Sequence, residues 1–185
     1  SVRAGPWDPI CCRTSDDWAD LGDLAACHCA VLFLDRQLPA EWLAVAADRA
    51  QAGGGLIGLR AAHGPWLCPA TRGSVLFGAE CLGRHINSSK PAVRIAPAAA
   101  LHPTVAGVRP FVAAGDLAVV RTLGAEAVLV GSALDRDEKV AWVCRCGAGR
   151  GFCTTLGHPA DFRQGSFLRL LANAVAWTSK GDVCR

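Results

Sequence analysis

The residues of this chain that could do acid–base or metal chemistry are few, and most of them stand beside predicted turns. Four of the five histidines lie in loops or at predicted strand ends. His85 belongs to the polar turn GRHINSS, and His102 and His158 each precede a proline. Imidazoles titrate near neutral pH and bind metals, so these three could cooperate if the fold brings them together. No HExxH or HxH spacing is present, and each histidine alone is more typical of a hydrogen-bonded loop residue.

Arg60 occupies a position where chemistry is often exposed. It follows the apolar run 56–59 and precedes two alanines, at the strand-to-helix elbow where some hydrolases carry a nucleophile. A guanidinium cannot attack a carbonyl and does not act as a base near neutral pH. It can bind a carboxylate, a phosphate or a sugar hydroxyl. The sequence therefore favours a binding role for Arg60 over a nucleophilic mechanism.

The segment 140–158, VAWVCRCGAGRGFCTTLGH, predicts the element that presents His158. Its pattern is a strand, a glycine-rich turn and a second strand, which ends at Gly157. A histidine just past a buried strand, beside a glycine, stands where α/β proteins expose functional groups. The alternative is a hairpin in which His158 only caps the strand.

A β-α-β unit is predicted before this hairpin. Residues 30–34 form a wholly apolar run, which is typical of a central parallel strand. Residues 37–52 predict a helix, with Pro39 in its first turn and Gly53 at its end. Residues 56–59 predict the second strand, so the unit implies a parallel sheet with a right-handed crossover.

The remaining elements follow from shorter patterns. Residues 61–92 predict a long connection, of the kind that often carries function, with one short helix at 75–82. Ser166 is the predicted N-cap of a closing helix over 166–178. Further strands are predicted at 93–96, 117–121 and 127–131.

Length and composition limit the class of protein. The 185 residues predict a single domain, and a hydrophobic share of 51% is typical of a packed globule. No window approaches the roughly 20 apolar residues of a membrane-spanning helix. The net charge of +3 is spread along the chain without a basic stripe, so neither a membrane nor a nucleic acid is an expected partner.

The ten cysteines are expected to behave as small hydrophobic residues, because most lie inside apolar runs. No pair of CxxC motifs indicates a structural zinc site. In Cys27-His28-Cys29 the strand alternation would place His28 on the face opposite the cysteines, which disfavours a metal there. The chain starts at Ser1 without a signal-peptide pattern or a hydrophobic first strand, which favours a fragment or a shortened domain.

Together, these blocks resemble the ThuA-like (trehalose utilisation) family, a branch of the class I glutamine amidotransferase-like fold. The resemblance extends from about Leu24 to Lys180. It is carried by GGGLIGLRAA at 53–62, the loop with Gly83 and His85, HPTVAGV at 102–108, the segment 140–158, Phe162 and LRLLANAVAW at 168–177.

The resemblance implies an α/β fold: a three-layer α/β/α sandwich with a flavodoxin-like, mostly parallel sheet. It implies a pocket at the carboxyl ends of the strands and a small sugar or sugar derivative as ligand. His85, His102 and His158 match family histidines and are the candidate catalytic residues. Arg60 and Asp116 are the candidate substrate-binding groups. A divalent metal such as zinc, held by the same three histidines, is a candidate cofactor; a cytoplasmic location is favoured, and a homo-oligomer is left open.

Departures from the family pattern leave two hypotheses. Arg60 stands where the family usually has a histidine, and the stretch from Gly115 has one carboxylate, Asp116, in place of the usual Asp-Glu pair and lacks the tyrosine. Cys146 and Cys153 stand where relatives usually carry tyrosine. The first hypothesis is a sugar-processing enzyme; the second is a non-catalytic, degenerate domain that only binds or supports. Glutamine amidotransferase activity is not expected, because no cysteine stands at the elbow.

Overall fold

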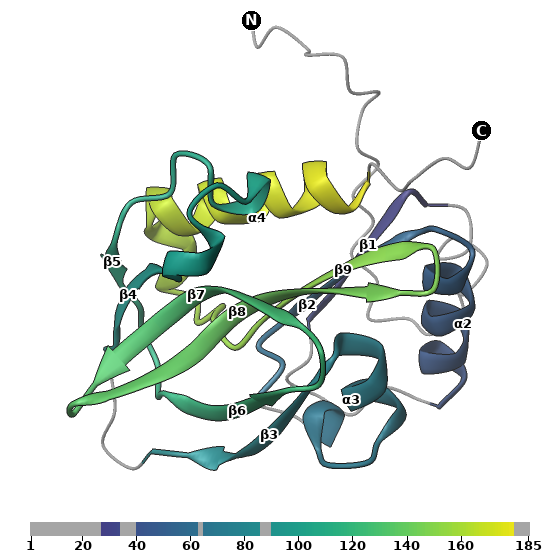
Figure 1. The fold of residues 1–185 in the computed structure, drawn as a ribbon, viewed down its shortest axis with the longest axis horizontal. Helices are drawn as coiled ribbons and strands as arrows, with labels where there is room; N and C mark the ends of the chain where they lie inside the picture. Colours follow the sequence, from purple (N-terminus) through teal and green to yellow (C-terminus); the bar gives the residue numbers. More distant parts are fainter. Residues whose placement is uncertain (1–26, 34–39, 63–64, 86–89, 180–185) are drawn as a thin grey trace, which may run out of the picture.

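The computed structural model describes residues 27–33, 40–62, 65–85 and 90–179. Within these ranges the chain forms a seven-stranded sheet of order β1-β2-β9-β8-β7-β4-β5 and a separate two-stranded sheet of β3 and β6 (Figure 1). Three α-helices, α2, α3 and α4, flank them. Ser1 and Pro39, on which two expectations rest, lie outside the described residues, as does His63, one of the five histidines.

The predicted β-α-β unit is confirmed. Strand β1 (Cys29–Phe33), helix α2 (Ala40–Gln51) and strand β2 (Gly55–Leu59) follow one another, and β1 pairs with β2 in parallel. Every residue of β2 is buried, which explains its uninterrupted apolar sequence. The unit delivers Arg60 at the carboxyl end of β2.

The predicted hairpin is confirmed as well. Strand β8 (Arg136–Cys146) turns through two residues into β9 (Gly149–Thr154), and the two strands pair antiparallel. Gly147 has a φ of 60°, and a Cβ on it would lie 2.6 Å from Cα of Gln51. This turn therefore requires glycine. Because β9 also pairs with β2 in parallel, both strands end at the same edge of the sheet.

The expectation of a mostly parallel sheet is wrong. Only the β1–β2 and β2–β9 pairs are parallel; the pairs from β9 through β8, β7 (Glu126–Ala133) and β4 (Ala92–Ile95) to β5 (Phe111–Val112) are antiparallel. The β7–β8 connection explains this in part. It is a two-residue turn in which Leu134 and Asp135 both have positive φ, as in a type I′ hairpin. Two residues can join antiparallel strands but cannot form a parallel crossover.

The predicted helix at 75–82 is displaced. Helix α3 spans Arg72–Phe77, and Gly78 ends it with a φ of 63°. The chain then continues as β3 (Ala79–Arg84), which pairs with β6 (Ala118–Thr122). Helix α4 spans Gly165–Thr178, and Gln164, not Ser166, is its N-cap residue. The hydroxyl oxygen of Ser166 instead accepts a hydrogen bond from the backbone N–H of Arg109.

Helices cover both faces of the large sheet (Figure 1). On one face, Phe167 and Leu170 of α4 pack with Ile57 and Phe152. On the other face, Ala46 and Ala50 of α2 and Phe77 of α3 pack in one cluster with Leu56, Trp142 and Cys153. Neighbouring residues of β2 thus serve opposite cores, as strand geometry requires.

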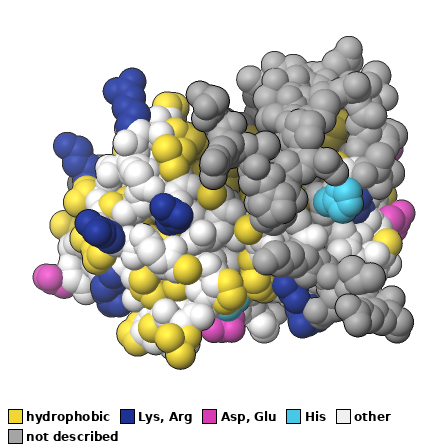
Figure 2. Space-filling view, turned by 90° about the horizontal axis from the view of Figure 1, so that it is seen from above, with side chains coloured by type: hydrophobic (Ala, Val, Ile, Leu, Met, Phe, Trp, Pro, Cys, Tyr) yellow, Lys and Arg dark blue, Asp and Glu magenta, His cyan; other side chains and the backbone are white. Residues whose placement is uncertain are grey.

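Charged side chains are scattered over the surface, and two cysteines lie in the core. In Figure 2, Lys and Arg side chains stand apart from one another among apolar and uncharged atoms. None of the helices in the described ranges has the length and apolar character that crossing a bilayer would need. Cys144 and Cys153 are buried in the core. Burial raises the pKa of Cys144 to about 12 and that of Cys153 well above its usual value, so both thiols stay protonated and pack as apolar groups.

Candidate functional site

A small cavity lies at the edge of the sheet where β2 and β9 end. Its volume is about 20 Å³, which is room for one water molecule or one ligand group of similar size. Predicted site residues Arg60, Asp116 and His158 all line it. The other lining residues are apolar or small: Pro91, Ala113, Ala114, Gly115, Thr155 and Leu156.

Arg60 reaches the cavity through a strained elbow. Its φ is 54°, in the left-handed region that residues other than glycine rarely adopt. The backbone N–H of Arg60 donates to the carbonyl of Leu156 at 3.0 Å, which joins the elbow to the loop after β9. The guanidinium carbon lies 5.9 Å from the ring centroid of Phe33, at cation–π distance. A Cβ on Gly157 would lie 3.1 Å from Cγ of Arg60, so glycine lets the two loops approach closely.

Asp161 holds the two walls of the cavity together, and the sequence analysis missed it. The residue is fully buried. Its carboxylate accepts hydrogen bonds from the backbone N–H groups of Gly157 at 3.0 Å, His158 at 2.9 Å and Ala114 at 2.7 Å. The first two bonds shape the loop after β9, and the third fixes the opposite wall. An acid three residues after His158 in the turn GHPAD was the available signal.

His158 is exposed, and its ring orientation is set by its own loop. Its Nδ1 accepts a hydrogen bond from the backbone N–H of Ala160 at 3.2 Å. This assignment places the proton of the neutral imidazole on Nε2. In this tautomer the free ring nitrogen of His158, Nε2, is a hydrogen-bond donor.

Asp116 faces the cavity from the opposite side. It is exposed, on the segment that leads into β6, and it follows Gly115, whose φ is 127°. The backbone N–H of Lys90 donates to the Gly115 carbonyl at 3.1 Å and anchors this segment. The residues that line the cavity thus include a cation, a hydrogen-bond donor and a carboxylate.

His85 lies near this site but does not line the cavity. Its Nε2 is 2.8 Å from Oε1 of Glu138, so the two form an ion pair when the imidazole is protonated. Its backbone N–H donates to the carbonyl of Leu117, the residue after Asp116. His85 is therefore engaged beside the segment that presents Asp116.

His102 belongs to a different part of the molecule. Its Nδ1 accepts from the backbone N–H of Thr104, and its ring packs edge-on against Trp177 at 5.0 Å between centroids. Trp177 lies in the last turn of α4, and the carbonyl of the next residue, Thr178, packs on Gly55 at the start of β2. His102 thus stands at the end of the sheet opposite Arg60. Burial lowers the pKa of His102.

The three predicted histidines consequently do not converge on one centre. Among the described residues, no group of three or more His, Cys, Asp or Glu side chains is placed to hold a metal ion. A shared zinc site made by His85, His102 and His158 therefore has no geometric basis, since only His158 lines the cavity.

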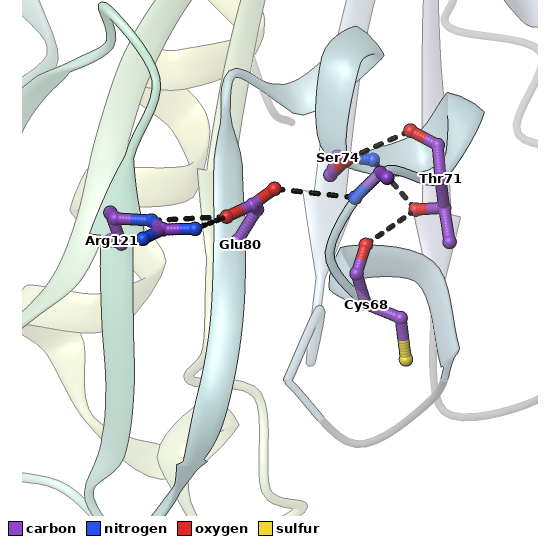
Figure 3. A network of polar contacts seen from close by, with 6 residues as sticks. Cys68, Thr71, Ser74, Glu80 and Arg121 are labelled. Carbon is purple, nitrogen blue, oxygen red and sulfur yellow. Dashed lines mark hydrogen bonds and ion pairs between the residues drawn. The ribbon is translucent and has the colours of Figure 1, made fainter.

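A second buried carboxylate, far from the cavity along the chain, shows what a purely structural acid looks like (Figure 3). Glu80 on β3 accepts from Nε of Arg121 at 3.0 Å and from the backbone N–H of Ala70 at 3.3 Å. The hydrogen bond from Arg121 is the main cause that lowers the pKa of Glu80. Nearby, Thr71 caps α3 by accepting from the N–H of Ser74. This network fixes a loop and, unlike the Arg60 site, borders no cavity that we identify among the described residues.

No family model and no curated protein matches the sequence. Solved structures do match the fold. A putative ThuA-like protein from Bacteroides uniformis superimposes with a TM-score of 0.69 and 18% identity, over 91% of this chain and 77% of that one. The chain has a ThuA-like fold. This resemblance in structure agrees with the sequence blocks that predicted it.

Two other solved structures share parts of this ThuA-like fold. A cytoplasmic protein from Salmonella typhimurium matches with a TM-score of 0.64 and 16% identity, over 85% of this chain and 74% of that one. A β-galactosidase from Rahnella sp. R3 matches with a TM-score of 0.62 and 13% identity, over 82% of this chain. The chain spans about a quarter, 24%, of that β-galactosidase. Identities this low show the shared fold alone.

Proposed function

We propose that this ThuA-like domain serves the utilisation of trehalose or a related sugar, and that the cavity at the ends of β2 and β9 binds a small sugar or sugar derivative. The observation that carries the proposal is the convergence of Arg60, Asp116 and His158 on one cavity. In sheets with parallel strands, ligands bind beyond the carboxyl ends of those strands. N–H donors and a carboxylate acceptor together suit the hydroxyl groups of a sugar, each of which both donates and accepts.

We also propose that the fold is a three-layer α/β/α sandwich of the flavodoxin-like, class I glutamine amidotransferase-like kind. The helices on both faces of the sheet support this arrangement. Amidotransferase chemistry is not part of the proposal, because the elbow carries the guanidinium of Arg60 in place of a nucleophile. A cytoplasmic location is proposed by analogy with the Salmonella neighbour.

A specific observation favours the non-catalytic alternative. His102 packs against Trp177 at the other end of the sheet, and Nδ1 of His158 is occupied by the backbone of Ala160. The acid–base set that the family resemblance implied is therefore not assembled at the cavity. Under this alternative the domain binds the sugar without converting it.

Binding by calorimetry tests the proposal. Trehalose, glucose and glucose derivatives are titrated into the full chain and into Asp116→Asn and His158→Ala. We expect at least one sugar to bind, and each substitution to weaken binding roughly tenfold, the effect of losing one good polar contact. His102→Gln is the matched histidine control and should bind normally. Binding that is insensitive to both cavity substitutions would contradict the proposal.

Product analysis separates the two versions. The bound sugar is incubated with the protein and examined by mass spectrometry. The enzymatic version predicts conversion that is lost in His158→Ala. The non-catalytic version predicts that the sugar is recovered unchanged while binding persists.

A further inference from the structure

The cavity is too small for a sugar ring, and its polar groups are unevenly distributed. A volume of about 20 Å³ admits one small terminal group, so the rest of any ligand must lie outside, over the exposed side chains of Asp116 and His158. We propose that this terminal group is a carboxylate: the cavity selects a sugar acid, such as an aldonate or a uronate, with its carboxylate on Arg60. This inference deepens the proposed function and rests on it.

The charge of the inner wall supports a carboxylate over a hydroxyl. Arg60 is half-buried and cationic, and apart from the exposed Asp116 and His158 the other lining residues are largely apolar or small, among them Pro91, Ala113 and Leu156. In such surroundings a guanidinium binds an anion far better than a neutral oxygen. Its planar fork of five N–H donors matches a carboxylate in bidentate geometry. Five donors also allow Arg60 to keep a contact within the protein while it binds a ligand.

The neighbouring groups orient the ligand. The tautomer of His158 leaves Nε2–H as a second donor toward the anion. Thr155 is buried, and its hydroxyl donates to the carbonyl of Val140 at 3.4 Å. We therefore do not expect this hydroxyl to bind the carboxylate of the ligand. Asp116 repels a second negative charge and accepts hydrogen bonds from hydroxyl groups. A molecule with an acid at one end and hydroxyls beside it satisfies both sides at once.

The local backbone supports a rigid site. Arg60 is held by the hydrogen bond from its N–H to Leu156, and the His158 loop by two hydrogen bonds to Asp161. The same carboxylate of Asp161 ties the Ala114 wall in place. The positive φ of Arg60 is a backbone conformation that persists only where the surrounding structure holds it in place. A site fixed in this way discriminates between ligands that differ by a single group.

Four ligands measured by calorimetry on the full chain test the inference: glucuronate, gluconate, glucose and acetate. We expect glucuronate or gluconate to bind at least roughly tenfold more tightly than glucose, because a hydrogen bond to a charged partner is stronger than one to a neutral group. Acetate, which lacks hydroxyls for Asp116, should bind more weakly than either sugar acid. Arg60→Gln should weaken binding of the sugar acids by roughly tenfold or more and so remove their preference over glucose.

Controls keep this experiment decisive. Arg169→Gln removes an exposed arginine on α4 and should change nothing. Arg60→Lys preserves the charge and much of the side-chain volume; it should retain part of the preference, and it replaces Arg60→Gln if that variant unfolds at a lower temperature. Thermal unfolding of every variant shows whether the fold is intact.

The outcomes separate the inference from the proposed function. Glucose binding as tightly as the sugar acids, with sensitivity to Asp116→Asn, would overturn the carboxylate subsite and leave the sugar pocket standing. Acetate binding as tightly as glucuronate would overturn the sugar-acid assignment. A preference for acids that persists in Arg60→Gln would overturn the role of Arg60. Absence of binding by all four ligands would overturn the inference, and absence of trehalose binding as well would overturn the proposed function.

Discussion

The loops at His158 and His102 are built alike but face different surroundings. Each histidine precedes a proline, and the Nδ1 atom of each accepts a hydrogen bond from the backbone N–H two residues later, on Ala160 and Thr104. His158 is exposed and lines a cavity with Arg60 and Asp116. His102 is half-buried against Trp177, at the opposite end of the sheet.

The difference shows that a His-Pro turn is a structural unit whose role depends on what the fold places beside it. Each loop also has an arginine near its histidine. Arg150 is committed to Trp177, since its Nη1 donates to the Trp177 carbonyl at 3.2 Å and its guanidinium carbon lies 5.4 Å from the ring. Arg60 also contacts a ring, that of Phe33, but in addition it lines the cavity. The residues around His102 pack against one another, whereas those around His158 leave a cavity that can hold part of a ligand.

The largest effect should come from removing the anchor of the His158 loop. Asp161→Ala leaves three backbone N–H groups near the cavity without their acceptor, so we expect the free energy of unfolding to fall by about 3 kcal/mol or more. Asp161→Asn keeps one acceptor oxygen and should cost less. Urea denaturation measures both variants. The matched control is Asp116→Asn, at an exposed acid, which should stay within about 0.5 kcal/mol of the parent.

The paired histidine variants come next. His102→Ala loses a capping acceptor and the edge-on contact with Trp177, and we expect the free energy of unfolding to fall by about 1–2 kcal/mol. His158→Ala, at an exposed position, should cost at most about 0.5 kcal/mol and should weaken ligand binding instead. A larger loss of stability in His158→Ala than in His102→Ala would contradict the comparison of the two loops.

The pH dependence of stability should single out His102. Burial lowers its pKa below the ordinary value of 6.5; Arg150 acts in the same direction and Glu126 opposes it. The unfolded chain therefore binds this proton more readily than the folded one. The stabilisation is complete above pH 6.5 and is lost as the pH falls through the lower, folded-state pKa. Unfolding curves between pH 5 and 8, compared with His102→Gln, measure this contribution; an identical pH profile for the two proteins would refute it.

Thiol labelling compares buried with exposed cysteines, and of the experiments proposed here it should affect stability least. Cys144, whose pKa burial raises to about 12, and buried Cys153 should resist alkylation at pH 8 in the folded protein. Exposed Cys68 should react, and Cys68→Ser provides the control. Mass spectrometry before and after denaturation identifies the labelled residues. Rapid labelling of Cys144 in the folded state would show that the core around it opens.

Local sequence patterns predicted a large part of this fold. The apolar run of β2, the helix before it and the glycine turn between β8 and β9 were predicted because their determinants lie close together in the sequence. The antiparallel half of the sheet was not predicted. The turn at Leu134 and Asp135 lacks the Asn-Gly or Asp-Gly signal that identifies a type I′ hairpin. Strand β3 was not predicted, because the range 75–82 was predicted as one helix. In the structure the helix ends at Phe77 with Gly78 as its C-cap.

The site was predicted in part, for a similar reason. Arg60 and His158 each follow a strand, and strand ends are visible in the sequence. Asp161 was missed because its role depends on Ala114, 47 residues away in the chain. The position of His102 could not be inferred either, because the packing of Trp177 against it is decided by where α4 ends on the sheet.

An NMR titration of the amide groups with glucuronate and with glucose tests the central claim most directly, because it reports both loops in one experiment. The account predicts that chemical shifts change at Ala114, Gly157 and His158, around the cavity, while the amide of Thr104 beside His102 stays unchanged. Shifts centred on Thr104 and Trp177, or no shifts with either ligand, would contradict the assignment of the Arg60, Asp116 and His158 cavity as the binding site.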